Sequence, residues 1–231
     1  MRPDHYDGFA EAYADDNESS LFNAYYERPA MLELAGDVNG RRVLDAGCGS
    51  GLLASALRAK GADVTGFDAS PAMVGLARNR LGDGVRVHVA DLAARLPFDD
   101  AEFDDVIASL VLHYLRDWTA PLAELRRILR PGGRLLVSVN HPAIFKLANL
   151  DADYFALTEW SEEYTFSAET AVLTYWHRPL HAMAAAFTDA GFRISVIGEP
   201  PPAPDTPPEL LADLGGRTRF LCFIFFVLEA A

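Results

Sequence analysis

Residues 43–51, V-L-D-A-G-C-G-S-G, constrain the fold of this 231-residue chain more than any other segment. Val43 and Leu44 are typical of the end of a buried strand, and the apolar run over 52–57 is typical of the start of a helix. Between them, glycine occupies every second position, at Gly47, Gly49 and Gly51. Such a turn adopts positive φ without a Cβ penalty and lets a ligand lie directly on the backbone. The segment therefore predicts a ligand-binding edge of an open α/β sheet.

The spacing of these glycines separates two classes of ligand. A dinucleotide fingerprint reads G-x-G-x-x-G, but here the third glycine comes one residue early and Leu52 takes the last position of that pattern. Asp45, two residues before the first glycine, would repel a pyrophosphate but suit a cationic or zwitterionic ligand. The turn therefore argues against a dinucleotide.

A carboxylate follows the next predicted strand, at residues 63–67. Asp68 comes about 20 residues after the glycine turn, where a carboxylate accepts hydrogen bonds from both ribose hydroxyls. The alternative is a helix cap, because Ser70 and Pro71 open another helix. The strand predicted for 85–89 ends in the same way, at Asp91 and Leu92. We expect Asp91 either to accept from an adenine amino group, with Leu92 packed on the ring, or to cap a helix.

Taken in order, these strand ends resemble the class I S-adenosylmethionine-dependent methyltransferases. The matching segments are V-L-D-A-G-C-G-S-G, V-T-G-F-D-A-S-P-A-M, V-A-D-L-A-A-R-L-P-F, F-D-D-V-I-A-S-L-V-L-H-Y-L, L-R-R-I-L-R-P-G-G-R-L-L-V-S, and the late Y-W-H-R-P-L and D-A-G-F. They cover residues 40–140 and 175–197 in the order that the family uses. The late segments resemble the branch that acts on small molecules, the type 11-like branch.

The resemblance implies an α/β, Rossmann-like sheet of seven strands, mostly parallel, with an antiparallel last strand and helices on both faces. Strand–helix alternation independently predicts parallel pairing. The predicted strands lie at 41–45, 63–67, 85–89, 103–108, 133–139, 192–197 and 220–228, and the predicted helices at 50–60, 71–81, 120–130 and 181–189. Thr119 is expected to cap the 120–130 helix and Pro131-Gly132-Gly133 to stop it. One domain over 1–231 accounts for this length.

Two segments lie outside this alternation. Residues 1–36 predict N-terminal cap helices, broken near Asp15-Asp16-Asn17. In the resembled family such helices cover the ligand mouth, which would bring Tyr6, Tyr13 or Tyr25 over the methionine part of the cofactor; the alternative is plain packing. The aromatic-rich insertion 141–179, with a hairpin expected around Ser167-Ala168-Glu169, is interpreted as a substrate lid, or alternatively as a packing or dimerisation flap.

The resemblance also implies that the cofactor is S-adenosylmethionine and indicates which residues would bind each part of it. Asp45, Gly47, Gly49 and Gly51 would hold its methionine part, with Tyr13 and Tyr25 closing over it. Asp68 and Ala69 would hold the ribose, with Met73 near the adenine and Asp91 and Leu92 around it. Ser109 and Leu110 would lie beside the transferred methyl. His141, then His113, then His177 are the expected candidates for a general base, with a structural role as the alternative for each.

Charge and composition disfavour several classes of binding partner. The net charge of −13 disfavours nucleic acid, which requires a basic footprint. The longest apolar run, Leu221–Leu228, is too short to cross a bilayer as a helix, and no secretory signal is visible. We therefore expect a cytoplasmic enzyme, monomeric or homodimeric, with a small-molecule acceptor and neither a nucleic-acid nor a membrane partner. The histidines lack ligand spacing with carboxylates or cysteines, so no metal is expected.

Two other functions stay open on the sequence. One is a nicotinamide-dependent oxidoreductase on a similar sheet, against which Leu52 and the Pro-Gly-Gly turn argue. The other is a non-catalytic S-adenosylmethionine-binding regulatory protein, against which the aromatic insertion argues. Titration with NADH and with S-adenosylhomocysteine would distinguish an oxidoreductase from a methyltransferase. Turnover on a panel of acceptors would distinguish a methyltransferase from a regulatory protein.

Overall fold

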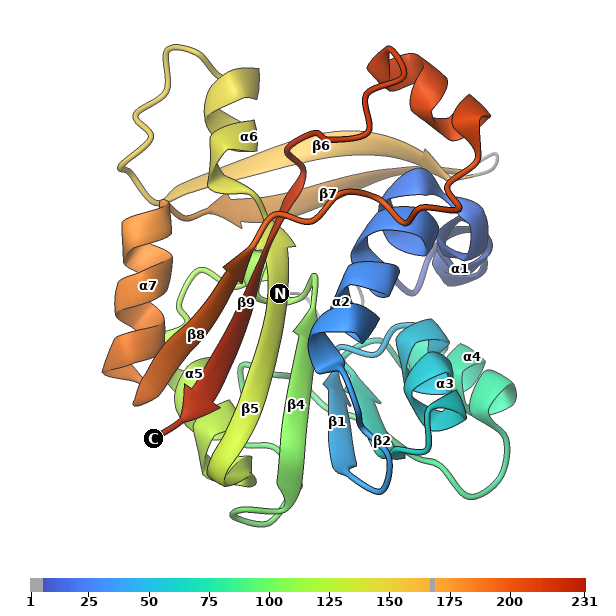
Figure 1. Ribbon diagram of the computed structural model, residues 1–231, viewed down its shortest axis with the longest axis vertical. Coiled ribbons are helices and arrows are strands. Elements are labelled where there is room, and N and C mark those ends of the chain that lie inside the picture. The colour runs from blue at the N-terminus through green and yellow to red at the C-terminus, as the bar shows by residue number, and fades with distance from the viewer. Residues whose placement is uncertain (1–5, 167–168) are drawn as a thin grey trace.

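The computed structural model describes residues 6–166 and 169–231, and within them one sheet of seven strands in the order β3-β2-β1-β4-β5-β9-β8 (Figure 1). The strands are β1 Arg42–Ala46, β2 Asp63–Asp68, β3 Arg86–Val89, β4 Phe103–Ser109, β5 Leu129–Asn140, β8 Phe192–Gly198 and β9 Phe223–Ala230. β9 runs antiparallel between β5 and β8, while β1 to β5 pair in parallel. The predicted fold class is confirmed, including the inserted antiparallel last strand.

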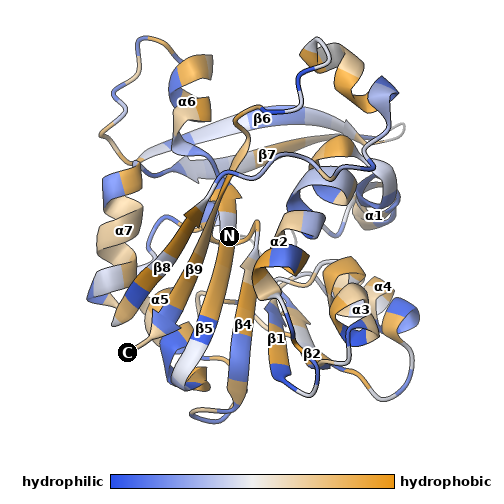
Figure 2. Ribbon diagram, viewed as in Figure 1, coloured by the Kyte–Doolittle hydropathy of each residue, from blue (hydrophilic) through white to orange (hydrophobic). Residues whose placement is uncertain are grey.

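Helices cover both faces of this sheet. The helices of the described residues are α1 Ala10–Ser19, the π-helix η1 Leu21–Glu27, α2 Arg28–Ala35, α3 Leu52–Ala59, α4 Pro71–Leu81, η2 Leu112–Tyr114, α5 Thr119–Ile128, α6 Pro142–Ala148, α7 Leu180–Asp189 and η3 Pro208–Leu214. Successive strand residues point to opposite faces, so Leu135 packs in the core on the α5 and α7 side and Leu136 in the core on the α2 to α4 side. β9 is apolar along most of its length, whereas β4 and β5 become hydrophilic towards their lower ends (Figure 2).

The insertion after β5 contains α6 and a separate hairpin. β6 (Thr158–Phe166) pairs antiparallel with β7 (Glu169–His177), and the pair lies across the carboxyl ends of the central strands (Figure 1). The expected hairpin is therefore present and is longer than predicted. Ser167 and Ala168 of its predicted turn lie outside the described residues.

Three predicted helix ends are wrong. α1 runs through Asp15-Asp16-Asn17 and ends at Ser19, followed by Ser20 with an extended ψ of 146°. The polar run fits within the helix, because Asp15 is exposed while Asn17 lines a cavity described below. α5 begins at Thr119, whose N–H donates to Asp117 Oδ1 at 2.9 Å. Asp117, and not Thr119, therefore satisfies the first free amide. The helix gives way to β5 at Leu129, before the Pro131-Gly132-Gly133 turn.

Candidate active site

The glycine turn between β1 and α3 is shaped by contacts on one side and open space on the other. The φ angles of Gly47 and Gly49 are 75° and 52°. A Cβ on Gly47 would lie 2.8 Å from Val111 Cγ2, whereas a Cβ on Gly49 would meet no atom within 4 Å. The N–H groups of Gly47 and Cys48 both donate to the carbonyl of Phe67, at 2.8 and 2.9 Å. The turn is therefore clamped to β2 and presents bare backbone at Gly49.

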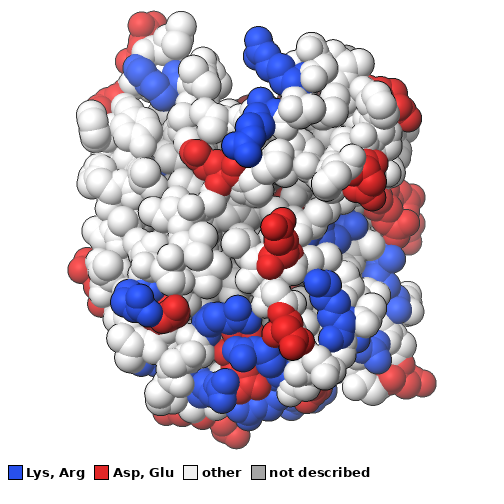
Figure 3. Space-filling view, in the orientation of Figure 1, with Lys and Arg blue, Asp and Glu red and all other residues white. Residues whose placement is uncertain are grey.

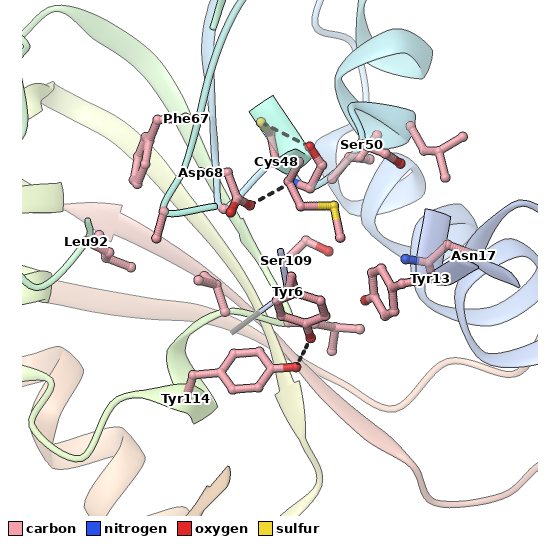
Figure 4. Close-up of a pocket in the computed structure, with 18 of the residues that line it drawn as sticks. Tyr6, Tyr13, Asn17, Cys48, Ser50, Phe67, Asp68, Leu92, Ser109 and Tyr114 are labelled. Carbon is pink, nitrogen blue, oxygen red and sulfur yellow. Dashed lines mark hydrogen bonds between the residues drawn. The ribbon is translucent and has the colours of Figure 1, made fainter. Parts of the chain in front are cut away.

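The open space belongs to a cavity of about 980 Å³, part of which is open to solvent. The glycine turn, the carboxyl ends of β2, β3 and β4, and the N-terminal helices surround it (Figure 4). Predicted residues that line it are Tyr13, Gly47, Gly49, Asp68, Ala69, Met73, Asp91, Leu92, Ser109 and Leu110. The structure thus brings ten of the cofactor candidates to one cavity.

Asp68 joins the strand edge to the glycine turn. Its Oδ2 accepts from Gly49 N at 2.9 Å and its Oδ1 from Ser70 N at 2.9 Å. Burial raises the pKa of Asp68, and the amides of Ser70 and Gly49 oppose that rise. The cap of α4 is Ser70, whose Oγ accepts from Met73 N at 3.1 Å. Asp68 is therefore a positioned anion at the cavity wall, and the N-cap role belongs to Ser70.

Asp91 caps no helix, since residues 91–98 form turns. Its Oδ1 accepts from Ala93 N at 2.9 Å, which is a local turn, while the residue also lines the cavity. Leu92 beside it is 4% exposed and offers an apolar surface there. The end of β3 therefore presents a carboxylate and an apolar side chain together.

Three other cofactor candidates do not line the cavity. Gly51 lies behind the turn, where a Cβ would be 3.2 Å from Ala77 Cα. Tyr25 is half-buried, its carbonyl accepting from Ala203 N, and it is absent from the cavity wall. Asp45 is 1% exposed beneath the glycine turn, and its Oδ2 has no hydrogen-bond partner among the described residues. Burial, with the negative charges of Glu27 and Asp68, raises the pKa of Asp45 to about 7.

Sequence reasoning missed the polar end of the cavity, formed by Glu27, Arg28, Asn17 and Asn23. Glu27 is 4% exposed, and burial raises its pKa against the opposing effects of two serine hydroxyls and Arg28. Burial lowers the pKa of Arg28, whose guanidinium donates to the carbonyl of Asn17 at 2.5 Å. The sequence signal was the adjacent acid and base, Glu27 and Arg28, in a mostly aromatic and apolar helical segment.

Aromatic side chains of the N-terminal segment and the hairpin also surround the cavity. The hydroxyls of Tyr6 and Tyr114 are hydrogen-bonded across it (Figure 4). Tyr13 packs edge-on against Phe166 of β6, with ring centroids 5.2 Å apart, and Phe9 stacks on the same ring at 5.7 Å. We call Tyr6, Phe9, Tyr13 and Phe166 the aromatic roof. It joins the N-terminal segment to the hairpin.

Two of the predicted bases have structural partners. His113 is 4% exposed, its Nδ1 accepts from Asn140 N at 3.1 Å, and burial lowers its pKa to about 3. His141 caps α6, because its Nδ1 accepts from Ala143 N at 3.1 Å, while its Nε2 is hydrogen-bonded to Glu199 Oε1 at 2.7 Å. His113 is therefore neutral and a poor proton acceptor, and His141 ties the insertion to the segment after β8.

The third predicted base, His177, is also engaged elsewhere. Its Nε2 donates to the carbonyl of Tyr154 at 2.8 Å, its ring stacks on Phe145 at 4.2 Å, and burial lowers its pKa. None of the three histidines belongs to the described lining of the cavity. The structure therefore does not bring the predicted bases together with the cofactor candidates.

This fold is shared with solved structures of S-adenosylmethionine-dependent methyltransferases. Residues 44–137 match the family model described as a methyltransferase domain, which spans the glycine turn, Asp68, Asp91 and the end of β4. Over this segment the chain is therefore similar to methyltransferases. Among the described residues, no cluster of side chains could hold a metal ion, and no helix has the length and apolar character needed to cross a membrane.

Relatives of known sequence or structure agree with this class. A ubiquinone biosynthesis O-methyltransferase of Xanthomonas euvesicatoria is 39% identical over 157 residues, which cover 64% of this chain and 63% of that protein. The chain thus spans less than two thirds of that relative's length. An S-adenosylmethionine-dependent methyltransferase of Mesorhizobium loti shares the fold, with a TM-score of 0.67, 24% identity and coverage of 87% of this chain and 96% of that one.

A second structure with the same fold contains ligands. It is the 1,6-didemethyltoxoflavin N1-methyltransferase of Burkholderia thailandensis, with bound 1,6-didemethyltoxoflavin and S-adenosylhomocysteine. Its TM-score is 0.62, its identity 21%, and the alignment covers 97% of this chain and 86% of that one.

Proposed function

We propose that this chain transfers the methyl group of S-adenosylmethionine to a small organic acceptor. The observation that carries this proposal is a single cavity in which the open glycine turn, Asp68 and Asp91 face an aromatic roof. The acidic strand ends suit an adenosyl group, and the aromatic end suits an apolar or aromatic acceptor beside it.

The residues on the cavity wall fit the cofactor from one end to the other. Asp91 and Leu92 would hold the adenine, and Asp68, fixed by two backbone amides, would accept from the ribose hydroxyls. Gly49 leaves room for the ligand on the backbone. When bound, the cofactor supplies a methyl group activated by a positively charged sulfur. Buried carboxylates around the turn favour such a cation, because charges attract more strongly where water is excluded.

We further propose that orientation contributes most of the rate. Holding two reactants in line is worth about 7–11 kcal/mol in favourable cases. The aromatic roof would exclude water and align the acceptor with the methyl, and no histidine base is needed for that step. Aromatic faces also tolerate a neighbouring cation.

The acceptor class is inferred from charge and from relatives. The net charge of −13 does not suit a nucleic-acid substrate. One relative is named for O-methylation in ubiquinone biosynthesis, and one structural neighbour holds a small heterocycle that its name marks for N-methylation. Both support a small molecule as the acceptor. The position in which the cavity holds the acceptor would decide which of its atoms receives the methyl group. We propose one domain over 1–231, with 1–36 as cap and 141–179 as substrate lid.

The first prediction tests cofactor binding at Asp68. Replacing Asp68 by Ala removes a charged acceptor, so the affinity for S-adenosylhomocysteine should fall at least about tenfold. Isothermal titration calorimetry measures it directly. Asp63→Ala, which removes the exposed acid at the start of the same strand, is the matched control and should bind as the wild type does.

Unchanged affinity in Asp68→Ala would reject the ribose assignment. Binding of NADH in place of S-adenosylhomocysteine by the wild type would reject the function itself. Tight binding without formation of S-adenosylhomocysteine from S-adenosylmethionine across a panel of phenols, amines and activated carbon acids would favour a regulatory protein.

A further inference from the structure

Glu27 is a buried carboxylate in the cavity wall that the proposed transfer does not require. It is the last residue of η1, which continues directly into α2. Its Oε1 accepts from Ser109 Oγ at 2.7 Å and from Ser138 Oγ at 2.6 Å. These hydroxyls stand at the carboxyl end of β4 and near that of β5. π-helical segments are rare and recur at functional sites, and this one sets a negative charge against two strand ends.

The second carboxylate oxygen of Glu27 faces the cavity. Oε2 accepts no hydrogen bond from the described residues, and it is not among the fully enclosed polar atoms without a partner. Because the residue lines the cavity, the solvent that reaches this oxygen does so from there. The carboxylate therefore has one oxygen held by two serine hydroxyls and one left for a ligand in the cavity.

The order of the strands places Glu27 at the end of the cavity where the charged part of the cofactor would lie. From β3 through β2 and β1 to β4, the cavity presents Asp91, then Asp68, then the glycine turn, then Ser109 with Glu27. Asp91 and Asp68 serve the adenosyl part in the proposed function. Among the described lining residues, Glu27 is the one acid at the opposite end, where the sulfur and the amino acid part would lie.

Three charged or titratable groups surround Glu27 at this end. Arg28 follows it in the chain, Asp45 lies beneath the glycine turn, and Tyr13 belongs to the aromatic roof. Arg28 suits the carboxylate of an amino acid, and Glu27 suits a positive charge. The ammonium group is common to cofactor and product, whereas the positive sulfur is present only before the methyl leaves.

We propose that Glu27 makes this pocket prefer positively charged S-adenosylmethionine to its neutral-sulfur product, S-adenosylhomocysteine. This inference rests on the proposed function. The carboxylate attracts the sulfonium while the cofactor is charged, and that attraction ends once the sulfur is neutral. Glu27 thus determines ligand specificity and favours exchange of product for fresh cofactor.

The test compares three ligands by calorimetry on wild type and Glu27→Gln. The amide keeps an oxygen for the serine hydroxyls and removes the charge. The affinity for S-adenosylmethionine should fall at least about tenfold, while that for S-adenosylhomocysteine changes less than about threefold. Methylthioadenosine, which lacks the amino acid part and the sulfur charge, should bind both proteins equally. Glu33→Gln removes an exposed charge from α2 and is the matched control.

Each other outcome overturns the proposal. Equal weakening of S-adenosylmethionine and S-adenosylhomocysteine would place Glu27 at the ammonium group only, and unchanged affinities would give it no role in binding. A wild type that binds none of the three ligands would overturn the proposed function as well, which distinguishes the two failures. If thermal unfolding shows that Glu27→Gln does not fold, Glu27→Met, an uncharged chain of similar length, takes its place with the same criteria.

Discussion

At the scale of single residues, Asp105 is a buried carboxylate paired with two arginines near the start of β4, whereas the cavity lies at the carboxyl end of that strand. It is 1% exposed on β4 and bonds to Arg41, which precedes β1, and to Arg134 of β5. The distances from Arg134 Nε and Nη2 to its two oxygens are 2.8 and 2.9 Å. Charged residues of both signs gather at this lower end of the sheet (Figure 3). Burial favours a higher pKa, but the two arginines outweigh it, and the pKa of Asp105 is lowered.

The lowered pKa of Asp105 predicts how stability depends on pH. A carboxylate with a depressed folded-state pKa contributes stability above its unfolded pKa of about 3.9 and loses it as pH falls through the folded value. Asp105→Asn should therefore lower the free energy of unfolding by about 3 kcal/mol at pH 7, because it leaves two partly buried arginines without their anion. The difference from wild type should shrink below about pH 4.

Urea unfolding at pH 7 and pH 3 measures this effect. Asp104→Asn makes the same change beside Arg42 and Arg130, whose side chains are both 47% exposed, and should cost only about 1 kcal/mol or less. Equal losses in the two variants, or a difference that does not vary with pH, would contradict the assignment.

The residues that sequence could predict are those whose surroundings are local. Gly49 and Asp68 follow directly from a strand end and a turn, and they meet because parallel strands end at one edge of the sheet. Glu27 could not be found in this way, since its hydroxyl partners lie 82 and 111 positions away in the chain. Whether the histidines could act as bases was not predictable for a related reason, because their hydrogen-bond partners are also not visible in the sequence. A histidine at a strand end is available for chemistry only if no neighbouring backbone group already uses its nitrogens, as Asn140 N does for His113.

At the scale of elements, local capping decided which helices were predictable. α4 was predicted with its observed bounds, because Ser70 caps its start and Gly82, with φ of 70°, follows its end. The end of α1 was not predictable from its polar run, since three exposed or half-exposed polar residues fit within a helix as well as at a break. The place of β9 in the sheet came from the resemblance and not from its apolar pattern, which suits either orientation.

His141 provides a prediction at this scale. As the cap of α6 and the partner of Glu199, it holds the insertion to the end of β8. His141→Ala should lower the free energy of unfolding by about 1 kcal/mol, as loss of a side-chain cap does, and should leave S-adenosylhomocysteine affinity unchanged. Thermal unfolding and calorimetry on the same preparation measure both.

A general base would behave differently. If His141→Ala kept its stability but lost methyl transfer by about a hundredfold or more, His141 would be the base after all. Glu199→Gln provides the control, because it weakens the same contact while leaving the histidine in place.

At the scale of the whole molecule, the cavity is assembled from parts that are distant in the chain. The methyltransferase core provides its floor, whereas the aromatic roof combines residues before α2 with a hairpin inserted after β5. Phe166 makes this connection on the hairpin side, being 6% exposed between Phe9 and Tyr13. Such satellite clusters open more readily than a central sheet. Access to the cavity should therefore depend on whether the N-terminal segment and the hairpin remain packed together.

Phe166→Ala tests this dependence. Removing the ring should loosen α1 and lower the affinity for S-adenosylhomocysteine about fivefold. The expected effect is modest because only a few aromatic contacts are lost, each worth about 0.5–1.5 kcal/mol. Hydrogen exchange should speed up in α1 and β6 and stay slow in β4 and β5, since the central sheet has its own core. Val172→Ala, at a side chain on β7 that is 55% exposed, should change neither quantity. Unaltered exchange in α1 would mean that the N-terminal segment holds its place without the hairpin, and the two halves of the roof would then act independently.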